Sequence, residues 1–142
     1  MKNIVFVCTG NTCRSPMAEG LFNMLAEKEG LPFRAVSCGL FPDAGAAPSA
    51  FAVEAAKELG ADILGHRAKP CTEELLADCC AVYCMTSAHA EQLSRAFPAF
   101  ADIIRTMPPS DISDPYGGGL DMYRTAAAQI LRSLRLITQE LK

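Results

Sequence analysis

The sequence has no long apolar run, no large excess of charge of either sign and no export signal. None of its apolar segments approaches the roughly 20 residues that a helix needs to cross a bilayer, so no membrane partner is expected. The formal net charge of −3 offers no basic surface field to nucleic acid. The apolar start, residues 1–7, is too short and wrongly followed for a signal peptide.

The cysteines also lack a pattern. There are seven of them, an odd number, and their spacing indicates no disulfide framework. Without an export signal, this usage favours a reducing cytoplasm. The chain has 142 residues, half of them apolar, and shows no repeat, low-complexity tract or linker. We therefore expect one domain over residues 1–142 with a full hydrophobic core.

What is present is an alternation of apolar strand-like runs and helical segments. Strands are expected at residues 3–8, 33–38, 80–85 and 103–107, with a short extended piece at 63–64. Helices are expected at residues 16–29, with Ser15 as the N-cap, and at 48–59, 73–78, 87–97 and 120–141. This order predicts an α/β fold, a single doubly wound parallel sheet of about four strands with helices on both faces. Such folds bind ligands where strand carboxyl ends meet helix N-termini.

The first such junction, residues 8–15, carries reactive side chains and is called the phosphate loop below. Cys8 ends a strand, Arg14 follows after five intervening residues, and Ser15-Pro16 is a typical helix opening. Loop amides, the helix N-terminus and the arginine would together bind a phosphate and favour the cysteine thiolate. The expected phosphate-binding residues are Thr9, Gly10, Asn11, Thr12, Cys13, Arg14 and Ser15. Gly10 is expected to take a backbone angle that other residues avoid, and Asn11 tolerates the left-handed region.

A second motif lies near the C-terminus, at residues 113–119, and is called the acid loop below. Cleavage of a phosphoester through cysteine needs an acid for the leaving group. Asp114, beside Pro115 and a glycine run, is the best candidate, first as acid and then as base for the hydrolytic water. No metal or other cofactor is needed for this chemistry.

Together the two motifs resemble the low-molecular-weight protein tyrosine phosphatase family over essentially the whole chain. Cys8-Thr9-Gly10-Asn11-Thr12-Cys13-Arg14-Ser15 matches the phosphate loop of that family, and Asp114-Pro115-Tyr116 its acid loop. The resemblance implies Cys8 as nucleophile, Arg14 as transition-state clamp and Asp114 as acid and base. It makes Ser15 the residue that stabilises the thiolate. A protein phosphatase acting through a phosphocysteine intermediate follows.

The resemblance also implies residues around the loop. Asn11, Ser37 and His66 would form a hydrogen-bond network behind it, and Cys13 would be the partner of Cys8 in a reversible protective disulfide.

Substrate choice depends on the rim of the site. The rim candidates are Thr12, Phe41 and Tyr116. Many tyrosine phosphatases carry a larger aliphatic residue in place of Thr12, and this version of the loop is similar to the protein arginine phosphatase branch. Phosphoarginine is therefore favoured over phosphotyrosine. The expected partners are phosphorylated proteins, the expected location is the cytoplasm, and a monomer is favoured.

Other hypotheses use the same residues differently. A thioredoxin-coupled arsenate reductase shares the fold and a similar loop, but it needs relay cysteines on a mobile segment. Cys79, Cys80 and Cys84 are expected instead in or beside a buried strand, and a zinc site built from them with Cys8 and Cys13 lacks the paired spacing. A non-catalytic phosphate-binding module would need neither nucleophile nor acid.

Three further residues are expected to have no role in the site. Cys38 and Cys71 are expected to be structural. His89, with its polar neighbours near a helix start, is expected on a solvated face.

Overall fold

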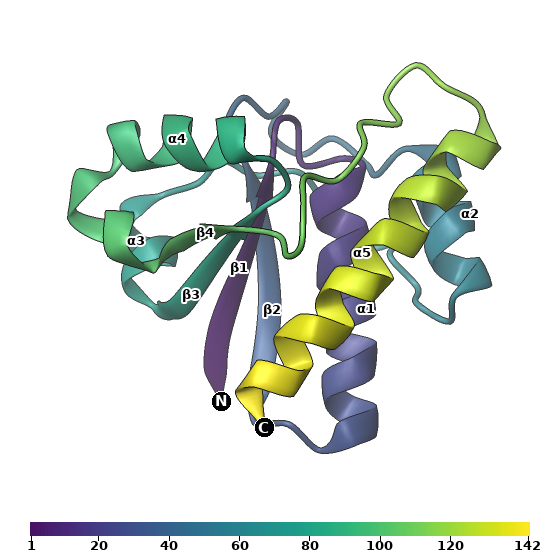
Figure 1. The fold of residues 1–142 in the computed structure, drawn as a ribbon. Coiled ribbons are helices and arrows are strands. Elements are labelled where there is room, and N and C mark those ends of the chain that lie inside the picture. Colours follow the sequence, from purple (N-terminus) through teal and green to yellow (C-terminus); the bar gives the residue numbers. More distant parts are fainter.

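The computed structural model describes all 142 residues as a four-stranded parallel sheet with helices on both faces (Figure 1). The strands are β1 (Lys2–Cys8), β2 (Phe33–Gly39), β3 (Cys79–Cys84) and β4 (Ile104–Thr106), in the order β2-β1-β3-β4. The helices are α1 (Arg14–Glu29), α2 (Ala50–Glu58), α3 (Glu73–Ala77), α4 (Ser87–Ala96) and α5 (Leu120–Leu141), with a 3₁₀ segment, η1 (Pro98–Ile103). The predicted fold class is confirmed.

The central strand β1 is buried on both faces, which explains its continuous apolar run. Ile4 and Phe6 point into a large core formed with α1, α2 and α5. Val5 and Val7 alternate with them and enter a smaller core on the opposite face, formed with α3 and α4. Helices therefore cover both faces of the sheet. The chain adds β2 on one side of β1 and then β3 and β4 on the other.

Two local expectations differ from the structure. Helix α1 begins at Arg14 with Cys13 as N-cap, so Ser15 is not the capping residue; its hydroxyl contacts Cys8 instead. Residues 63–64 form no strand, and Pro70 pairs with Gly39 beside β2. Elsewhere the expected elements are found with small shifts at their ends, and α5 has the expected bounds.

Cys38 and Cys71 form a disulfide, with Cα atoms 5.0 Å apart. The expectation that the chain has no disulfide was wrong. The expectation that Cys38 and Cys71 have a structural role, and no role in the site, agrees with the bond. Their 33-residue separation gives no signal, because the pairing of Gly39 with Pro70 is what brings the two chain segments together.

The connections after β1, β3 and β4 all lie at the carboxyl edge of the sheet (Figure 1). The phosphate loop follows β1, the first turn of α4 follows β3, and the acid loop lies between β4 and α5. This convergence brings Cys8 and Asp114, distant in sequence, to one place. No helix combines the length and apolar character that crossing a membrane requires.

Candidate active site

The Cys8 side chain lies at the carboxyl end of β1 and is held by two polar contacts. Its Sγ is 2.9 Å from the hydroxyl of Ser15 and 3.3 Å from the backbone N–H of Asn11, which donates to it. Helix α1 begins at Arg14, so its positive N-terminal end lies beside the sulfur. A hydroxyl, an amide and a helix N-terminus all favour a negatively charged sulfur at this position.

Asn11 fixes the shape of the phosphate loop. Its φ angle is +57°, the only left-handed value at a non-glycine residue, and its side chain is fully buried. The amide Nδ2 donates to Ser15 Oγ at 2.8 Å and to Ser37 Oγ at 3.0 Å, while Oδ1 accepts from the backbone N–H of Lys69 at 3.0 Å. His66 Nε2 lies 2.8 Å from the Asn11 carbonyl oxygen. The structure thus brings together the expected group of Asn11, Ser37 and His66.

The expectation for Gly10 was wrong, because Gly10 has no positive φ. The glycine that the loop requires is Gly39, at the end of β2. A Cβ there would lie 2.8 Å from the carbonyl oxygen of Thr9 and 3.1 Å from the Asn11 nitrogen. Beyond it, Leu40 N–H donates to the carbonyl of Cys8 at 3.0 Å. The bare backbone of Gly39 allows the neighbouring strand to support the loop from behind.

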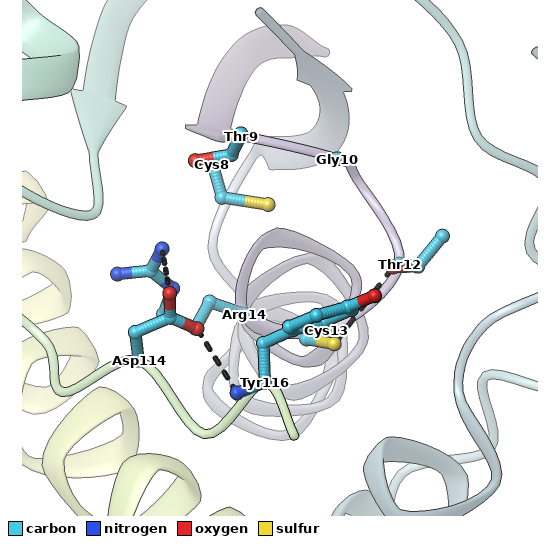
Figure 2. A pocket seen from close by; sticks show the side chains of 8 residues that line it. All are labelled: Cys8, Thr9, Gly10, Thr12, Cys13, Arg14, Asp114 and Tyr116. Atoms are coloured by element: carbon cyan, nitrogen blue, oxygen red, sulfur yellow. Dashed lines mark hydrogen bonds and ion pairs between the residues drawn. The ribbon is translucent and has the colours of Figure 1, made fainter. Parts of the chain in front are cut away.

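Arg14 and Asp114 lie beside each other at the cavity that Cys8 also lines (Figure 2). Arg14 is 5% exposed; its Nη1 donates to the carbonyl of Ile112 at 3.1 Å, and Nη2 lies 3.8 Å from Asp114 Oδ2. The Asp114 side chain is 61% exposed, and its Oδ1 accepts from the backbone N–H of Tyr116 at 3.0 Å. The arginine is therefore fixed, whereas the carboxylate faces the opening.

These groups surround one cavity of about 230 Å³. It is lined by Cys8, Thr9, Gly10, Thr12, Cys13, Arg14, Asp114 and Tyr116 (Figure 2). Two of the three expected rim residues, Thr12 and Tyr116, line it. The third, Phe41, does not: it is 74% exposed and is tied to the loop only through its backbone N–H, which donates to the Thr9 carbonyl at 2.9 Å.

The remaining thiols occupy different surroundings. Cys13 Sγ is 3.5 Å from the Tyr123 hydroxyl and 3.6 Å from the Ser49 hydroxyl; burial, followed by the Cys13 contact, raises the pKa of Tyr123. Cys84 is buried in β3, and burial raises the pKa of its thiol to about 12. The cysteines that an arsenate reductase would use as a relay, Cys79, Cys80 and Cys84, belong to a strand of the sheet.

Two polar residues near the site were missed by the sequence analysis. Glu19 accepts a hydrogen bond from the Ser37 hydroxyl at 2.8 Å and so extends the network behind the loop. His89, expected on a solvated face, is 7% exposed, and its Nε2 is 2.7 Å from Thr9 Oγ1. Glu19 could have been predicted from the sequence, because it lies four residues after Ser15 and so on the same face of α1. The sequence contains no comparable signal for the burial of His89. No group of three or more His, Cys, Asp or Glu is arranged to hold a metal ion.

The fold and this loop define a class of α/β protein in which a cysteine at the end of the first strand lies beside the N-terminus of the first helix. A family model for low molecular weight phosphotyrosine protein phosphatase matches residues 3–142. The chain therefore belongs to the low molecular weight protein tyrosine phosphatase family, and its members are protein phosphatases.

Among its relatives, a protein-arginine-phosphatase of Bacillus subtilis is 38% identical over 99% of this chain and 97% of its own length. The solved structure of a low molecular weight protein tyrosine phosphatase from T. tengcongensis is 39% identical, with a TM-score of 0.95 over 99% of this chain and 100% of the other. That of an arginine phosphatase mutant with a phosphorylated active-site serine is 36% identical, with a TM-score of 0.93 over 98% and 95% of the two chains.

Proposed function

We propose that the chain hydrolyses phosphorylated side chains of proteins, with phosphoarginine preferred to phosphotyrosine, through a phosphocysteine intermediate. The observation that carries the proposal is the cavity in which Cys8, Arg14 and Asp114 face one another at the carboxyl edge of the sheet. A binding module would have no use for a nucleophile and a carboxylic acid on opposite sides of an anion site. A single domain, a monomeric state and a cytoplasmic location belong to the same proposal.

The first step is attack by the Cys8 thiolate on phosphorus. The S–P bond forms while the P–O or P–N bond to the substrate side chain breaks, and Asp114 transfers its proton to the departing atom. The Arg14 guanidinium offers a planar pair of donors to the phosphoryl oxygens, and the Ile112 carbonyl fixes its orientation. Charge that develops on the phosphoryl oxygens is thus met by groups already in position.

The second step regenerates the enzyme. The Asp114 carboxylate accepts a proton from a water molecule as that water attacks the phosphocysteine; the S–P bond breaks and inorganic phosphate and the Cys8 thiolate are released. Ser15 supports the leaving sulfur, because its hydroxyl is 2.9 Å from Sγ. Asp114 thus donates one proton in the first step and regains one from water in the second, so the enzyme returns to its starting state.

The rim supports the preference for phosphoarginine. Thr12 and Asp114 present oxygen atoms around the cavity, and Tyr116, 80% exposed, is the one aromatic side chain in its lining. A guanidinium needs hydrogen-bond acceptors along its edge, whereas a phenyl ring needs apolar walls. The name of the Bacillus subtilis relative, a protein-arginine-phosphatase, agrees with this preference.

Turnover of p-nitrophenyl phosphate with excess chelator tests the reaction class. We expect full activity in the parent protein and none in Cys8→Ser, because a serine hydroxyl is not ionised at neutral pH. Asp114→Asn is expected to lose about 10²- to 10⁴-fold with a peptide substrate, the usual contribution of a general acid, and less with p-nitrophenolate, which leaves without a proton. Undiminished activity in Cys8→Ser would remove the proposal; arsenate-dependent oxidation of thioredoxin would replace it with the reductase.

Substrate choice is tested by the ratio of kcat/KM for phosphoarginine and phosphotyrosine peptides. Thr12→Ile is expected to shift the ratio towards phosphotyrosine, since it replaces a hydroxyl by an apolar group. Thr12→Ser is the matched control, which keeps the hydroxyl and should keep the sign of the preference. A ratio that is equal in all three proteins would exclude Thr12 as the determinant.

A further inference from the structure

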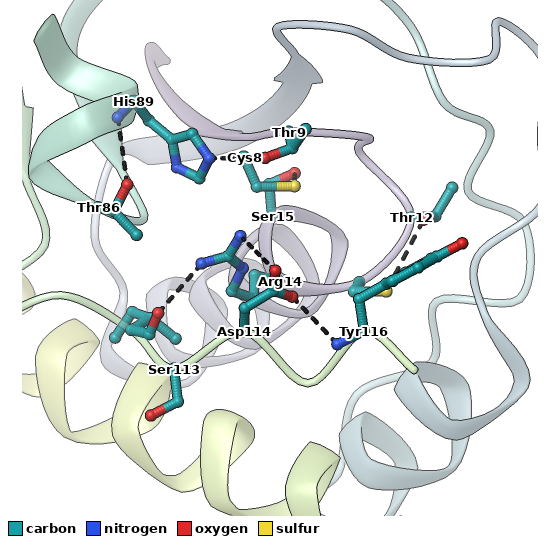
Figure 3. Close-up of polar contacts among 12 residues, drawn as sticks. Cys8, Thr9, Thr12, Arg14, Ser15, Thr86, His89, Ser113, Asp114 and Tyr116 are labelled. Carbon is teal, nitrogen blue, oxygen red and sulfur yellow. Dashed lines mark hydrogen bonds and ion pairs between the residues drawn. The ribbon is translucent and has the colours of Figure 1, made fainter. Parts of the chain in front are cut away.

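His89 is a buried polar residue that the proposed reaction leaves without a role. It lies in the first turn of α4, where its backbone N–H donates to the Thr86 hydroxyl at 3.1 Å. Its ring extends from the helix to the wall of the cavity, and Nε2 is 2.7 Å from Thr9 Oγ1 (Figure 3). Thr9 follows the nucleophile in sequence and lines the cavity. A residue 80 positions away thus contacts the wall beside Cys8.

The other ring nitrogen determines where the proton lies. His89 Nδ1 is buried and has no hydrogen-bond partner. A proton on Nδ1 would be a buried donor without an acceptor, which is rarer and costlier than an unpaired acceptor. The neutral ring therefore carries its proton on Nε2 and donates it to the hydroxyl of Thr9.

The charged ring is disfavoured for the same reason, since its second proton would lie on Nδ1. Burial and, after it, the nearby Arg14 guanidinium lower the pKa of His89, while Asp114 and Asp111 act in the opposite direction. Arg14 comes from α1 and the two aspartates from the segment between β4 and α5. The ring thus remains a neutral donor to Thr9.

A hydroxyl that accepts from His89 still has its own proton to donate. Thr9 Oγ1 has no other hydrogen-bond partner in the protein, and its side chain borders the cavity. The acceptors that a substrate brings there are the phosphoryl oxygens. We propose that His89 is a positioning residue that orients the Thr9 hydroxyl as a hydrogen-bond donor to the bound phosphoryl group. This inference rests on the proposed function, because it assigns the cavity to a phosphoryl ligand.

The test is a double-mutant cycle on the inhibition constant of inorganic phosphate, measured against p-nitrophenyl phosphate turnover. Thr9→Val removes the hydroxyl but keeps the shape, and His89→Leu removes the donor that orients it. We expect each single variant to weaken phosphate inhibition about fivefold, the usual worth of one neutral hydrogen bond. The double variant should also show about fivefold, not the product of the two effects, because both changes remove the same interaction.

Two matched variants separate this role from support of the fold. Thr9→Ser restores the hydroxyl and should recover most of the phosphate affinity lost in Thr9→Val. Thr86→Ala removes the N-cap of the same helix without touching the cavity; it should lower the urea midpoint and leave the phosphate inhibition constant as in the parent. An effect of Thr86→Ala on inhibition equal to that of His89→Leu would show that only the helix start matters, and would overturn the proposal.

The tautomer offers a readout that needs no turnover. Nitrogen-15 chemical shifts of His89 in the parent protein should show the proton on Nε2 and an unprotonated Nδ1. A proton on Nδ1 would overturn the inference, and so would multiplicative effects in the cycle or phosphate inhibition that neither single variant changes. Each of these results would contradict only the role of His89 and would still be compatible with phosphatase activity of the parent protein, whereas failure of the proposed function appears as activity that survives Cys8→Ser.

Discussion

Replacing Asn11 by alanine tests whether one side chain holds the phosphate loop in shape. The change removes three hydrogen bonds, two donated by Nδ2 and one accepted by Oδ1. Each is worth about 1 kcal/mol, which gives a loss of about 3 kcal/mol. Alanine must also take the φ of +57°, where a Cβ costs about 1 kcal/mol relative to residues that tolerate this region. The expected loss in unfolding free energy is about 4 kcal/mol.

Asn11→Gly separates the two contributions. Glycine loses the same three hydrogen bonds but adopts the left-handed conformation without a steric cost. We therefore expect Asn11→Gly to lose about 3 kcal/mol, about 1 kcal/mol less than alanine. Urea unfolding followed by circular dichroism measures both losses, and p-nitrophenyl phosphate turnover should fall in both proteins because Ser15 loses a partner.

Either of two results would refute this reasoning. A loss below about 1 kcal/mol in Asn11→Ala would mean that the buried network does not determine the stability of the loop. A glycine variant no more stable than the alanine variant would mean that the left-handed backbone at Asn11 carries no cost. An unchanged kcat/KM in both variants would mean that the hydrogen bonds of the Asn11 side chain do not affect catalysis.

Three further changes give sharp expectations. Gly39→Ala places a Cβ against the loop backbone and should lose about 1–3 kcal/mol together with activity, whereas Gly65→Ala, with nothing within 4 Å, should change neither; equal urea midpoints would contradict this. Cys71→Ser opens the link to Cys38, which closes a loop of 33 residues, and should lower stability by about 3–4 kcal/mol; reductant should do the same to the parent and nothing to the variant. The folded-state pKa of His89 lies below its ordinary value of 6.5, so its contribution to stability is full above pH 6.5 and declines as the pH falls below 6.5. Urea unfolding of His89→Gln between about pH 7 and 5 should therefore show a smaller loss of stability than that of the parent.

The sequence predicted the fold, and most of the residues that it singled out at the two motifs line one cavity, for identifiable reasons. Buried strands such as β1 are continuous apolar runs, and α5 keeps one apolar face over its whole length. The residues of the phosphate loop are contiguous, so their spacing alone placed Cys8 and Arg14 at opposite ends of a single loop. Asp114 was expected at the same site because an aspartate beside a rigid proline and a glycine run suits a loop over a pocket, and it lines the cavity.

What failed depended on contacts between distant segments. Nothing near His89 in sequence marks it as buried, because the Thr9 hydroxyl that it meets comes from the phosphate loop, 80 residues away. The disulfide of Cys38 with Cys71 requires a pairing beside β2 that no local pattern specifies. Gly10 was given the unusual backbone angle on residue type alone, whereas the surrounding hydrogen bonds place that angle at Asn11.

These failures share a physical cause that bears on how such chains are compared. The groups proposed to react lie in two short motifs, but the groups that hold them come from elsewhere: Lys69 N–H on Asn11, the Ile112 carbonyl on Arg14, and Gly39 behind the loop. Two of these three contacts are made by backbone atoms, which carry no residue signature. A chain with both motifs intact and a larger residue in place of Gly39 would match by spacing and still present a distorted loop, since a Cβ would lie 2.8 Å from a loop carbonyl. Motif spacing therefore indicates the chemistry proposed for the site, while the shape of the loop depends on how the sheet edge packs against it.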